Sequence, residues 1–215
     1  MLVGERMKHP VITTRPDTPI MDALNLMKQE RIRRLPVVKN GKLVGIITEE
    51  DLLNASASST TTLNVWELNY LLSKIKVDDV MTKEVKTVNE DMPIEDAARI
   101  MADNKIGGLP VMRGDDLVGI ITETDLFKIL LELMGAREKG VRLTGYIQEK
   151  PGELAKLTQA ITSAGGNFLA VGTFAGDTPS NRMFTIKVEG VEEETLKEIV
   201  SPLVERITDI RYCCP

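Results

Sequence analysis

The feature that most constrains this chain is an internal repeat with an offset of 74 positions, which aligns 7–52 with 81–126 without a gap. About half of the paired positions are identical. The longest identical run is Leu-Val-Gly-Ile-Ile-Thr-Glu, at 43–49 and again at 117–123. A repeat that stays in register over this length predicts one structural unit built twice.

Each copy has the pattern of a β-α-β-β-α unit. A short β-type run precedes a helix that starts at a proline, which the first helical turn tolerates. The helix carries apolar residues at helical spacing, and two apolar runs follow it. In the first copy these runs flank Asn40-Gly41, a strong hairpin signal. The β-type runs are Val11–Thr14 and Val85–Val88; the helical apolar residues are Ile20, Ala23, Leu24 and Met27, then Ile94, Ala97, Ala98 and Met101; the second turn is Gly114-Asp115-Asp116; and the second helices begin near Glu49 and Glu123.

A single copy is too small to cover both faces of its own sheet. Two copies can bury these faces against each other, which predicts a pseudo-two-fold pair within the chain, and we expect such pairs to associate into a homodimer. The predicted organisation is α+β, with a first unit at 1–56, an inter-repeat loop and helix at 57–77, a second unit at 78–136 and a third domain at 140–215.

The insert between the copies begins with a Ser/Thr-rich run at 55–62, which predicts a loop. Asn64 and Glu67 then have the spacing of a capping box, which predicts a helix. Trp66 and Tyr70 fall on one stripe of that helix. They fit either core packing or a dimer or partner surface.

After Gly135 and Gly140 the pattern changes to strand, helix, strand, strand, helix, strand. The first strand alternates over Val141–Ile147, and the helix after Pro151-Gly152 ends at Gly165-Gly166, a C-cap signal. This order is that of a ferredoxin-like fold. The remaining predicted elements are strands at 167–174 and 183–188 around a turn at 176–181, a helix over 192–204 that Pro202 kinks or ends, and a last strand at 207–212.

Composition excludes several classes of protein. The net charge of −5 and the pI of about 5.1 argue against a nucleic-acid binder, which needs a basic face. Apolar stretches such as Ile129–Met134 are too short to span a bilayer, and no signal peptide opens the chain, so we expect a cytoplasmic protein without membrane association. The adjacent Cys213 and Cys214 are expected to be reduced thiols.

No pattern of catalytic residues is visible in the sequence. The only histidine, His9, has no nucleophile that the sequence places beside it, and there is no Walker-type or Rossmann glycine string. No His, Cys and carboxylate cluster has the spacing of metal ligands. We therefore predict a protein that is not an enzyme and holds no metal.

Residues 1–135 resemble a CBS domain pair, or Bateman module. The resemblance rests on Leu-Pro-Val at 35–37 and 109–111, and on Gly-Ile-Ile-Thr-Glu-x-Asp-Leu at 45–52 and 119–126. It implies a regulatory protein whose ligand is an adenine nucleotide, AMP, ADP or ATP, with S-adenosylmethionine as the less favoured ligand.

The resemblance also implies roles for single residues: the threonine meets the phosphate, the aspartate meets the ribose, and the first strand surrounds the adenine. The residues alone leave two interpretations open. The threonine hydroxyl at a helix start can bind a phosphate or only cap the helix, and the carboxylate can accept ribose hydroxyls or only favour the helix dipole. The implied nucleotide-binding residues are Thr13, Thr14, Pro36, Thr48 and Asp51, and in the second copy Thr87, Val88, Gly108, Pro110, Thr122 and Asp125.

The two copies differ where phosphates would bind. Arg33-Arg34 in the first copy aligns with Gly107-Gly108 in the second. Guanidinium groups favour a polyanion, whereas glycines permit close approach but add no charge. We predict unequal nucleotide sites, the one with Arg33 or Arg34 preferring more phosphates. The alternative is that both arginines lie on a solvated surface.

Residues 140–215 resemble an ACT domain, through Glu-Lys-Pro-Gly-Glu-Leu at 149–154 and Gly-Gly-Asn-Phe at 165–168. This implies an amino acid bound at a dimer interface, in contact with Gly152 and Asn167. The family often has Asp at the position of Glu149, which weakens that part of the match. The alternative is that Gly152 only forms a turn and Asn167 only satisfies backbone groups.

The complete layout of two CBS units, the insert and an ACT domain resembles the acetoin-utilisation protein AcuB family. This resemblance implies a regulator of a metabolic enzyme, with a link to acetoin catabolism, whose partner the sequence does not identify. The alternative is a dimerisation or scaffolding module that docks on a partner enzyme without a ligand.

Overall fold

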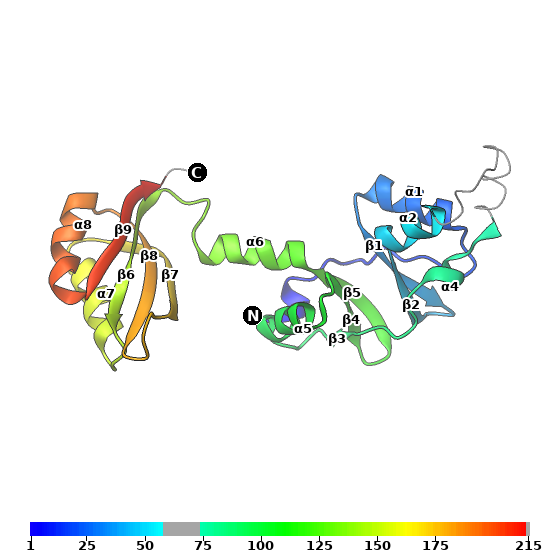
Figure 1. Ribbon diagram of the computed structural model, residues 1–215, viewed down its shortest axis with the longest axis horizontal. Coiled ribbons are helices and arrows are strands. Elements are labelled where there is room, and N and C mark those ends of the chain that lie inside the picture. The colour runs from blue at the N-terminus through cyan, green and yellow to red at the C-terminus, as the bar shows by residue number, and fades with distance from the viewer. Residues whose placement is uncertain (58–73, 214–215) are drawn as a thin grey trace. The chain divides into compact units, whose positions relative to one another are not determined.

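The computed structural model describes residues 1–57 and 74–213 and divides into two compact units, Met1–Leu126 and Phe127–Pro215 (Figure 1). Each unit is described by itself. The predicted insert helix, with Asn64, Trp66, Glu67 and Tyr70, lies outside the described residues, as does Cys214.

The first repeat folds into a helix, an antiparallel hairpin and a second helix: α1 (Ile20–Glu30), β1 (Arg34–Lys39), β2 (Lys42–Thr48) and α2 (Glu49–Ala57). The turn of the hairpin has positive φ at both central residues, 52° at Asn40 and 79° at Gly41. These values belong to the type I′ turn, for which Asn-Gly is the favoured pair, so the predicted hairpin is confirmed.

The second repeat has the same elements after a two-residue strand: β3 (Val88–Asn89), α5 (Ile94–Asn104), β4 (Gly108–Arg113), β5 (Asp116–Thr122) and α6 (Glu123–Leu133). The apolar residues predicted to face the core from the two first helices are buried, apart from the half-buried Ala98. Each hairpin shifts register after its central valine, Val37 or Val111, which pairs with Gly45 or Gly119. The repeat thus preserves even a local irregularity.

The predicted first strand of each repeat is wrong over most of its length. Of Val11–Thr14 only Thr14 pairs, in an isolated bridge with Val37, and of Val85–Val88 only Val88 lies in a strand. The physical reason is that each segment crosses between the two repeats. Lys8 pairs with Ile120 of the second repeat before Thr14 reaches the first, so the residues between them have no strand beside them.

The two repeats exchange their leading segments. These segments contain the short helices η1 (Val3–Glu5) and α4 (Val77–Val80), and both Val3 and Val77 are fully buried. Each β-bridge of one leading segment has a counterpart 74 positions along the chain. The matched bridges are Leu2 with Pro93 and Lys76 with Pro19, then Lys8 with Ile120 and Thr82 with Ile46. The pairing within residues 1–126 therefore has the predicted pseudo-two-fold relation.

The second unit has the predicted order of strands and helices: β6 (Gly140–Gln148), α7 (Glu153–Ser163), β7 (Asn167–Ala175), β8 (Asn181–Glu189), α8 (Glu193–Val200), the 3-10 turn η2 (Ser201–Leu203) and β9 (Arg206–Cys213). The strands form one antiparallel sheet in the order β7-β8-β6-β9. The helix predicted over 192–204 is shorter than expected, because α8 ends at Val200. Pro202 has no backbone N–H to donate, so the chain continues as a 3-10 turn.

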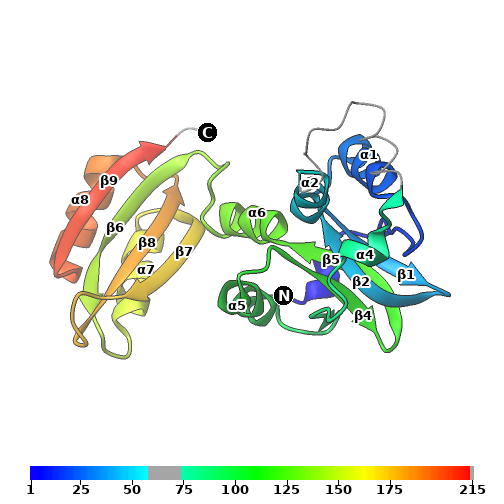
Figure 2. The ribbon, with the colours of Figure 1, turned by 45° about the vertical axis from the view of Figure 1, so that its right-hand side comes forward.

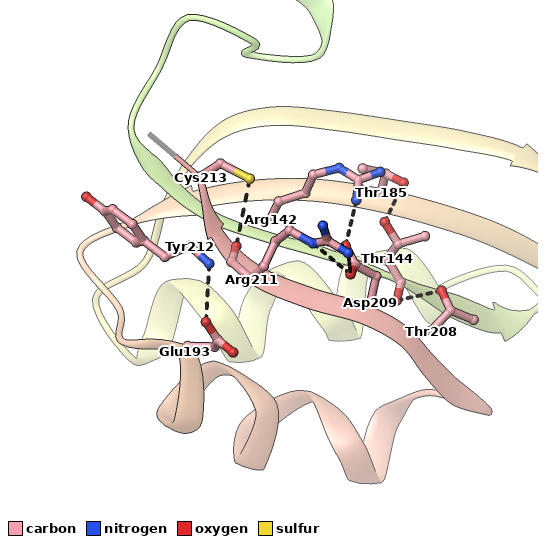
Figure 3. A network of polar contacts seen from close by, with 9 residues as sticks. All are labelled: Arg142, Thr144, Thr185, Glu193, Thr208, Asp209, Arg211, Tyr212 and Cys213. Carbon is pink, nitrogen blue, oxygen red and sulfur yellow. Dashed lines mark hydrogen bonds and ion pairs between the residues drawn. The ribbon is translucent and has the colours of Figure 1, made fainter. Parts of the chain in front are cut away.

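One face of this sheet packs on α7 and α8 (Figure 2). Its core is centred on Phe184, Leu143 and Ile186, all fully buried. On the same strands, polar side chains hydrogen-bond to each other. The hydroxyls of Thr144 and Thr185 are 2.9 Å apart, and Figure 3 shows them side by side.

A buried lysine ties this sheet to the end of α6. Lys187 is 4% exposed, and its Nζ donates to the carbonyl oxygen of Gly135 at 2.9 Å. Gly135 has a φ of 56°, and the N–H of Ala136 donates to the carbonyl oxygen of Leu131. These are the features of a Schellman motif, so Gly135 ends α6 in the left-handed conformation that glycine adopts readily.

Candidate functional site

The junction of β2 and α2 places Thr48 and Asp51 against each other. Oδ2 of Asp51 accepts hydrogen bonds from the backbone N–H of Thr48 at 2.9 Å and from its hydroxyl at 2.7 Å. The backbone N–H of Asp51 donates to Oγ1 of Thr48 at 3.2 Å. This is the reciprocal pattern of a capping box, with Asp at the position that usually carries Glu. The capping interpretation therefore describes Thr48 in this structure.

The second repeat has the same arrangement in a more buried setting. Oδ2 of Asp125 accepts from the backbone N–H of Thr122 at 3.0 Å and from its hydroxyl at 2.6 Å. Thr122 is 9% and Asp125 6% exposed, whereas Thr48 and Asp51 are half-buried. The segment Gly-Ile-Ile-Thr-Glu-x-Asp-Leu, present in both repeats, thus forms two equivalent helix starts. In each, the hydrogen bonds from the threonine fix the orientation of the carboxylate.

Each threonine also lines a cavity between the two repeats. The larger, which we call the Thr48 cavity, has a volume of about 470 Å³, and the smaller Thr122 cavity about 170 Å³. The two are related by the offset of 74. Lys8, Val11, Arg31, Ile120 and Thr122 line the Thr122 cavity where Thr82, Val85, Lys105, Ile46 and Thr48 line the Thr48 cavity. The repeat therefore produces two equivalent cavities in one compact unit.

Arg33 and Arg34 line both cavities. Nη1 of Arg34 donates to the carbonyl oxygen of Gly107 in the second repeat. The two glycines leave room for the arginine side chain in this position, because a Cβ on Gly107 would lie 2.5 Å from Nη2 of Arg34, and one on Gly108 2.9 Å from its Cδ. Burial and the neighbouring Arg33 lower the pKa of the Arg34 guanidinium, while Glu123 and Asp125 act in the opposite direction. The Arg-Arg and Gly-Gly pairs thus meet as complementary parts of one contact.

The charges around the cavities differ. The Thr122 cavity is lined by Lys8, Arg31, Arg33 and Arg34, with no acidic side chain among its described lining residues. The Thr48 cavity has Arg33, Arg34, Lys86 and Lys105, but also the acidic Glu49, Glu50 and Glu84. The Thr122 cavity therefore attracts an anion with several charges more strongly, since no acidic side chain among its described lining residues repels it.

The other predicted nucleotide-binding residues lie elsewhere around the repeats. Thr13 and Thr14 line a further cavity of about 820 Å³ beside the Asn40-Gly41 turn. Pro36 and Pro110 lie in β1 and β4, paired with Ile46 and Ile120 of the neighbouring strands. Thr87 directly precedes β3, and Val88 is buried in it. Asp51 and Asp125 do not line the two cavities themselves, but each accepts a hydrogen bond from the threonine that does.

Sequence reasoning missed the basic residues that the leading segments and first helices bring to the cavities, above all Lys8, Arg31 and Lys105. One signal pointed to the leading segments: the repeat begins at Met7 and Met81, several residues before the first predicted strand. Met7 and Met81 pack directly against Gly119 and Gly45, where a Cβ would collide with their sulfur atoms.

In the second unit, Gly152 and Asn167 do not meet within one chain. Gly152 precedes α7 with a φ of 92°, near the end of β6 where Gln148 pairs with Asn181. Asn167 pairs with Glu189 at the other end of β8 and donates from Nδ2 to that carboxylate at 2.7 Å. β8 has 9 residues, so its ends are roughly 27 Å apart at about 3.4 Å per residue. Glu149 pairs with Arg182.

Within residues 1–57 and 74–213, no three His, Cys, Asp or Glu side chains form a group that could hold a metal ion. In the same part of the chain, no helix is long and apolar enough to cross a membrane.

Comparison with known proteins finds similar sequences and solved structures for the first unit. The profile of the CBS domain matches residues 3–58 and 77–132. The CBS domain pair of protein MJ0100, solved with 5′-methylthioadenosine and S-adenosyl-L-methionine, is 32% identical, covers 60% of this chain and 95% of its own, and has a TM-score of 0.52.

Two further solved structures are similar over the same region. CBSX2 of Arabidopsis thaliana, in complex with AMP, is 30% identical over 60% of this chain and 96% of its own, with a TM-score of 0.51. A Vibrio cholerae protein provisionally named acetoin utilization protein (AcuB) is 33% identical over 64% of this chain and 96% of its own, with a TM-score of 0.54.

Proposed function

The chain belongs to the CBS domain family, and from this premise we propose that residues 1–126 bind an adenosine-containing ligand and thereby regulate a partner. The observation that supports this most is the pair of equivalent cavities, each beside a helix start with an oriented Thr–Asp pair. The positive end of the helix dipole and the threonine hydroxyl favour a phosphate at these helix starts, and the carboxylate can accept ribose hydroxyls. Two similar structures hold AMP or S-adenosylmethionine with methylthioadenosine.

The two cavities are proposed to prefer different ligands. The charged residues that line the Thr122 cavity are all basic, which favours ADP or ATP, whose phosphates carry several charges. The mixed lining of the Thr48 cavity favours a ligand with fewer negative charges, such as AMP, or one that also carries a positive charge, such as S-adenosylmethionine. The basis of the earlier prediction is wrong, because Arg33 and Arg34 line both cavities and cannot distinguish them. The proposed difference rests instead on Glu49, Glu50 and Glu84, which line only the Thr48 cavity.

A thermal-shift screen with AMP, ADP, ATP and S-adenosylmethionine tests the proposal. A ligand at 100 times its Kd stabilises the folded chain by about 2.7 kcal/mol, so the melting temperature must rise. Asp125→Ala and Asp51→Ala are each expected to remove the shift that comes from one cavity.

The matched controls are Asp125→Glu and Asp51→Glu. Glutamate keeps the capping box but moves the carboxylate by one methylene, so a loss of binding in these variants separates ligand contact from helix capping. If none of the four compounds raises the melting temperature, the alternative function applies: a scaffolding module that docks on a partner enzyme without a ligand.

For the second unit we propose an ACT-type site for an amino acid, completed by a second copy of the chain. β7 is an edge strand with Val171 and Phe174 exposed, so two β7 strands can pair antiparallel across a two-fold axis. In that pairing the second sheet runs in the opposite direction, so Asn167 of one copy lies at the end of the other sheet that carries Gly152. The two residues, which lie far apart within one chain, then come together from two copies.

Analytical ultracentrifugation of Val171→Lys tests this second proposal. A charge on the edge of β7 should prevent two β7 strands from pairing, and so lower the association state of the chain and abolish any thermal shift that amino acids produce. Thr173→Lys, on the same strand, is a second disruptive variant. An amino-acid thermal shift that survives both substitutions would overturn this arrangement. The regulated partner is proposed to be a metabolic enzyme, and an acetoin-catabolic enzyme is the first to test by pull-down.

A further inference from the structure

One arginine pair serves two cavities. Arg33 and Arg34 are among the lining residues of both the Thr48 cavity and the Thr122 cavity. Arg34 reaches the second repeat, where Gly107 and Gly108 leave room for its side chain and Gly107 accepts its hydrogen bond. The guanidinium therefore lies between the places where two ligands would bind.

The pseudo-two-fold relation does not supply a second such pair. The positions equivalent to Arg33 and Arg34 are the two glycines themselves, so the second repeat offers no guanidinium in return. The other basic residues are divided between the cavities: Lys8 and Arg31 line only the Thr122 cavity, and Lys86 and Lys105 line only the Thr48 cavity.

We propose that Arg34 couples the two cavities, so that a polyanion bound in one weakens the binding of a polyanion in the other. This inference rests on the proposed function and specifies how its two sites are regulated. An anion in either cavity attracts the same guanidinium, and one guanidinium cannot give its full charge and donors to two anions at once. The two bound anions also repel each other across the protein interior.

The coupling is reciprocal, because a change in the affinity of one site by the other must work equally in both directions. Coupling of this kind amounts to about 5- to 150-fold in affinity. The Thr122 cavity fills first, since its described lining carries four basic side chains and no acidic one. The Thr48 cavity then fills at a higher ligand concentration than it would if the Thr122 cavity were empty.

The test uses inorganic tripolyphosphate as the probe and the full chain with ¹³C-labelled methionine methyl groups. Met7 packs on Gly119 next to Lys8, so its signal reports the Thr122 cavity. Met81 packs on Gly45 next to Thr82, so its signal reports the Thr48 cavity. Met7→Leu and Met81→Leu assign the two signals.

Four variants distinguish a shared arginine from a simple loss of positive charge. Arg34→Met should weaken tripolyphosphate at both cavities by at least about fivefold and remove their dependence on each other, whereas Arg34→Lys should retain part of both effects. Arg31→Gln should weaken the binding of tripolyphosphate only in the Thr122 cavity. Lys105→Gln, the equivalent substitution, should weaken it only in the Thr48 cavity.

The sign of the coupling gives the sharpest result. In Arg31→Gln the Thr122 cavity fills later, so the Thr48 cavity should take up tripolyphosphate at a lower concentration than in the unmodified chain. An unchanged Thr48 cavity in Arg31→Gln, or an effect of Arg34→Met confined to one cavity, overturns the inference. A chain that binds AMP but no tripolyphosphate also overturns it and leaves the proposed function standing. The expected tripolyphosphate pattern without binding of any adenosine compound overturns the proposed function alone.

Discussion

The two repeats of the first unit share their framework and differ in what lines their cavities. Leu35 and Leu109 are both fully buried, and both repeats begin their second helix with the same Thr–Asp contact. The differences gather around the cavities, where Glu50 aligns with Thr124 and Glu84 with Pro10. The comparison teaches that the identical residues maintain one fold, while the substituted ones allow two ligand preferences within it.

The largest expected effect tests the shared framework. Leu35→Ala and Leu109→Ala should each lower the free energy of unfolding by about 2–5 kcal/mol, because each leaves a cavity in a fully buried position. Urea denaturation followed by circular dichroism measures both. If one of the two costs less than about 1 kcal/mol, the repeats do not share an equivalent core.

A smaller effect tests the contact between Arg34 and the glycines. Gly107→Ala would bring a Cβ within 2.5 Å of Nη2 of Arg34 and 2.8 Å of Oε2 of Glu123. Relieving this overlap should cost about 1–3 kcal/mol of stability and displace the guanidinium from the Gly107 carbonyl.

The control for this prediction is the double variant Gly107→Ala with Arg34→Ala. With the arginine side chain shortened, the added methyl group should cost much less, and the difference between the two backgrounds gives the interaction energy. An equal cost in both backgrounds would show that Arg34 does not require glycine at this position.

Local features of this unit could be predicted from the sequence because they depend on neighbouring residues. Asn40-Gly41 adopts positive φ values readily. The side chains of Thr48 and Asp51, three residues apart, each accept a hydrogen bond from the backbone N–H of the other residue. The cavities could not be predicted, because they depend on the exchange of leading segments. Nothing in the residues around Lys8 shows that it pairs with Ile120, more than 100 positions away.

A third and smaller effect is expected at the starts of the second helices, α2 and α6. Thr48→Ala and Thr122→Ala should each cost about 0.5–2 kcal/mol through loss of the cap, measured by urea denaturation. Thr122→Ala should cost more, because it removes the hydroxyl hydrogen bond to the buried carboxylate of Asp125, whereas Asp51 is half-buried. Serine at either position keeps the hydroxyl and should restore most of the loss. An equal cost for both alanine variants would argue that burial does not distinguish the two starts.

The smallest expected effect concerns an ion pair that only the second repeat can form. Glu90 accepts hydrogen bonds from Arg113, with Nη2 to Oε2 at 2.7 Å. The equivalent positions in the first repeat are Pro16 and Lys39, which cannot pair in this way. Hydrogen bonding to Arg113 lowers the pKa of Glu90, although partial desolvation opposes it.

A lowered carboxyl pKa in the folded chain means that the unfolded chain takes up the proton first as the pH falls. The stabilisation from this pair is therefore complete above the ordinary value of about 4.3 and is lost as the pH falls through the lowered pKa. NMR titration of the Glu90 carboxyl should show a midpoint below 4.3 that returns to about that value in Arg113→Gln. Lys39→Gln in the first repeat should leave it unchanged. An ordinary midpoint in the unmodified chain would mean that water competes successfully with Arg113, and that the second repeat gains no charge interaction here that the first lacks.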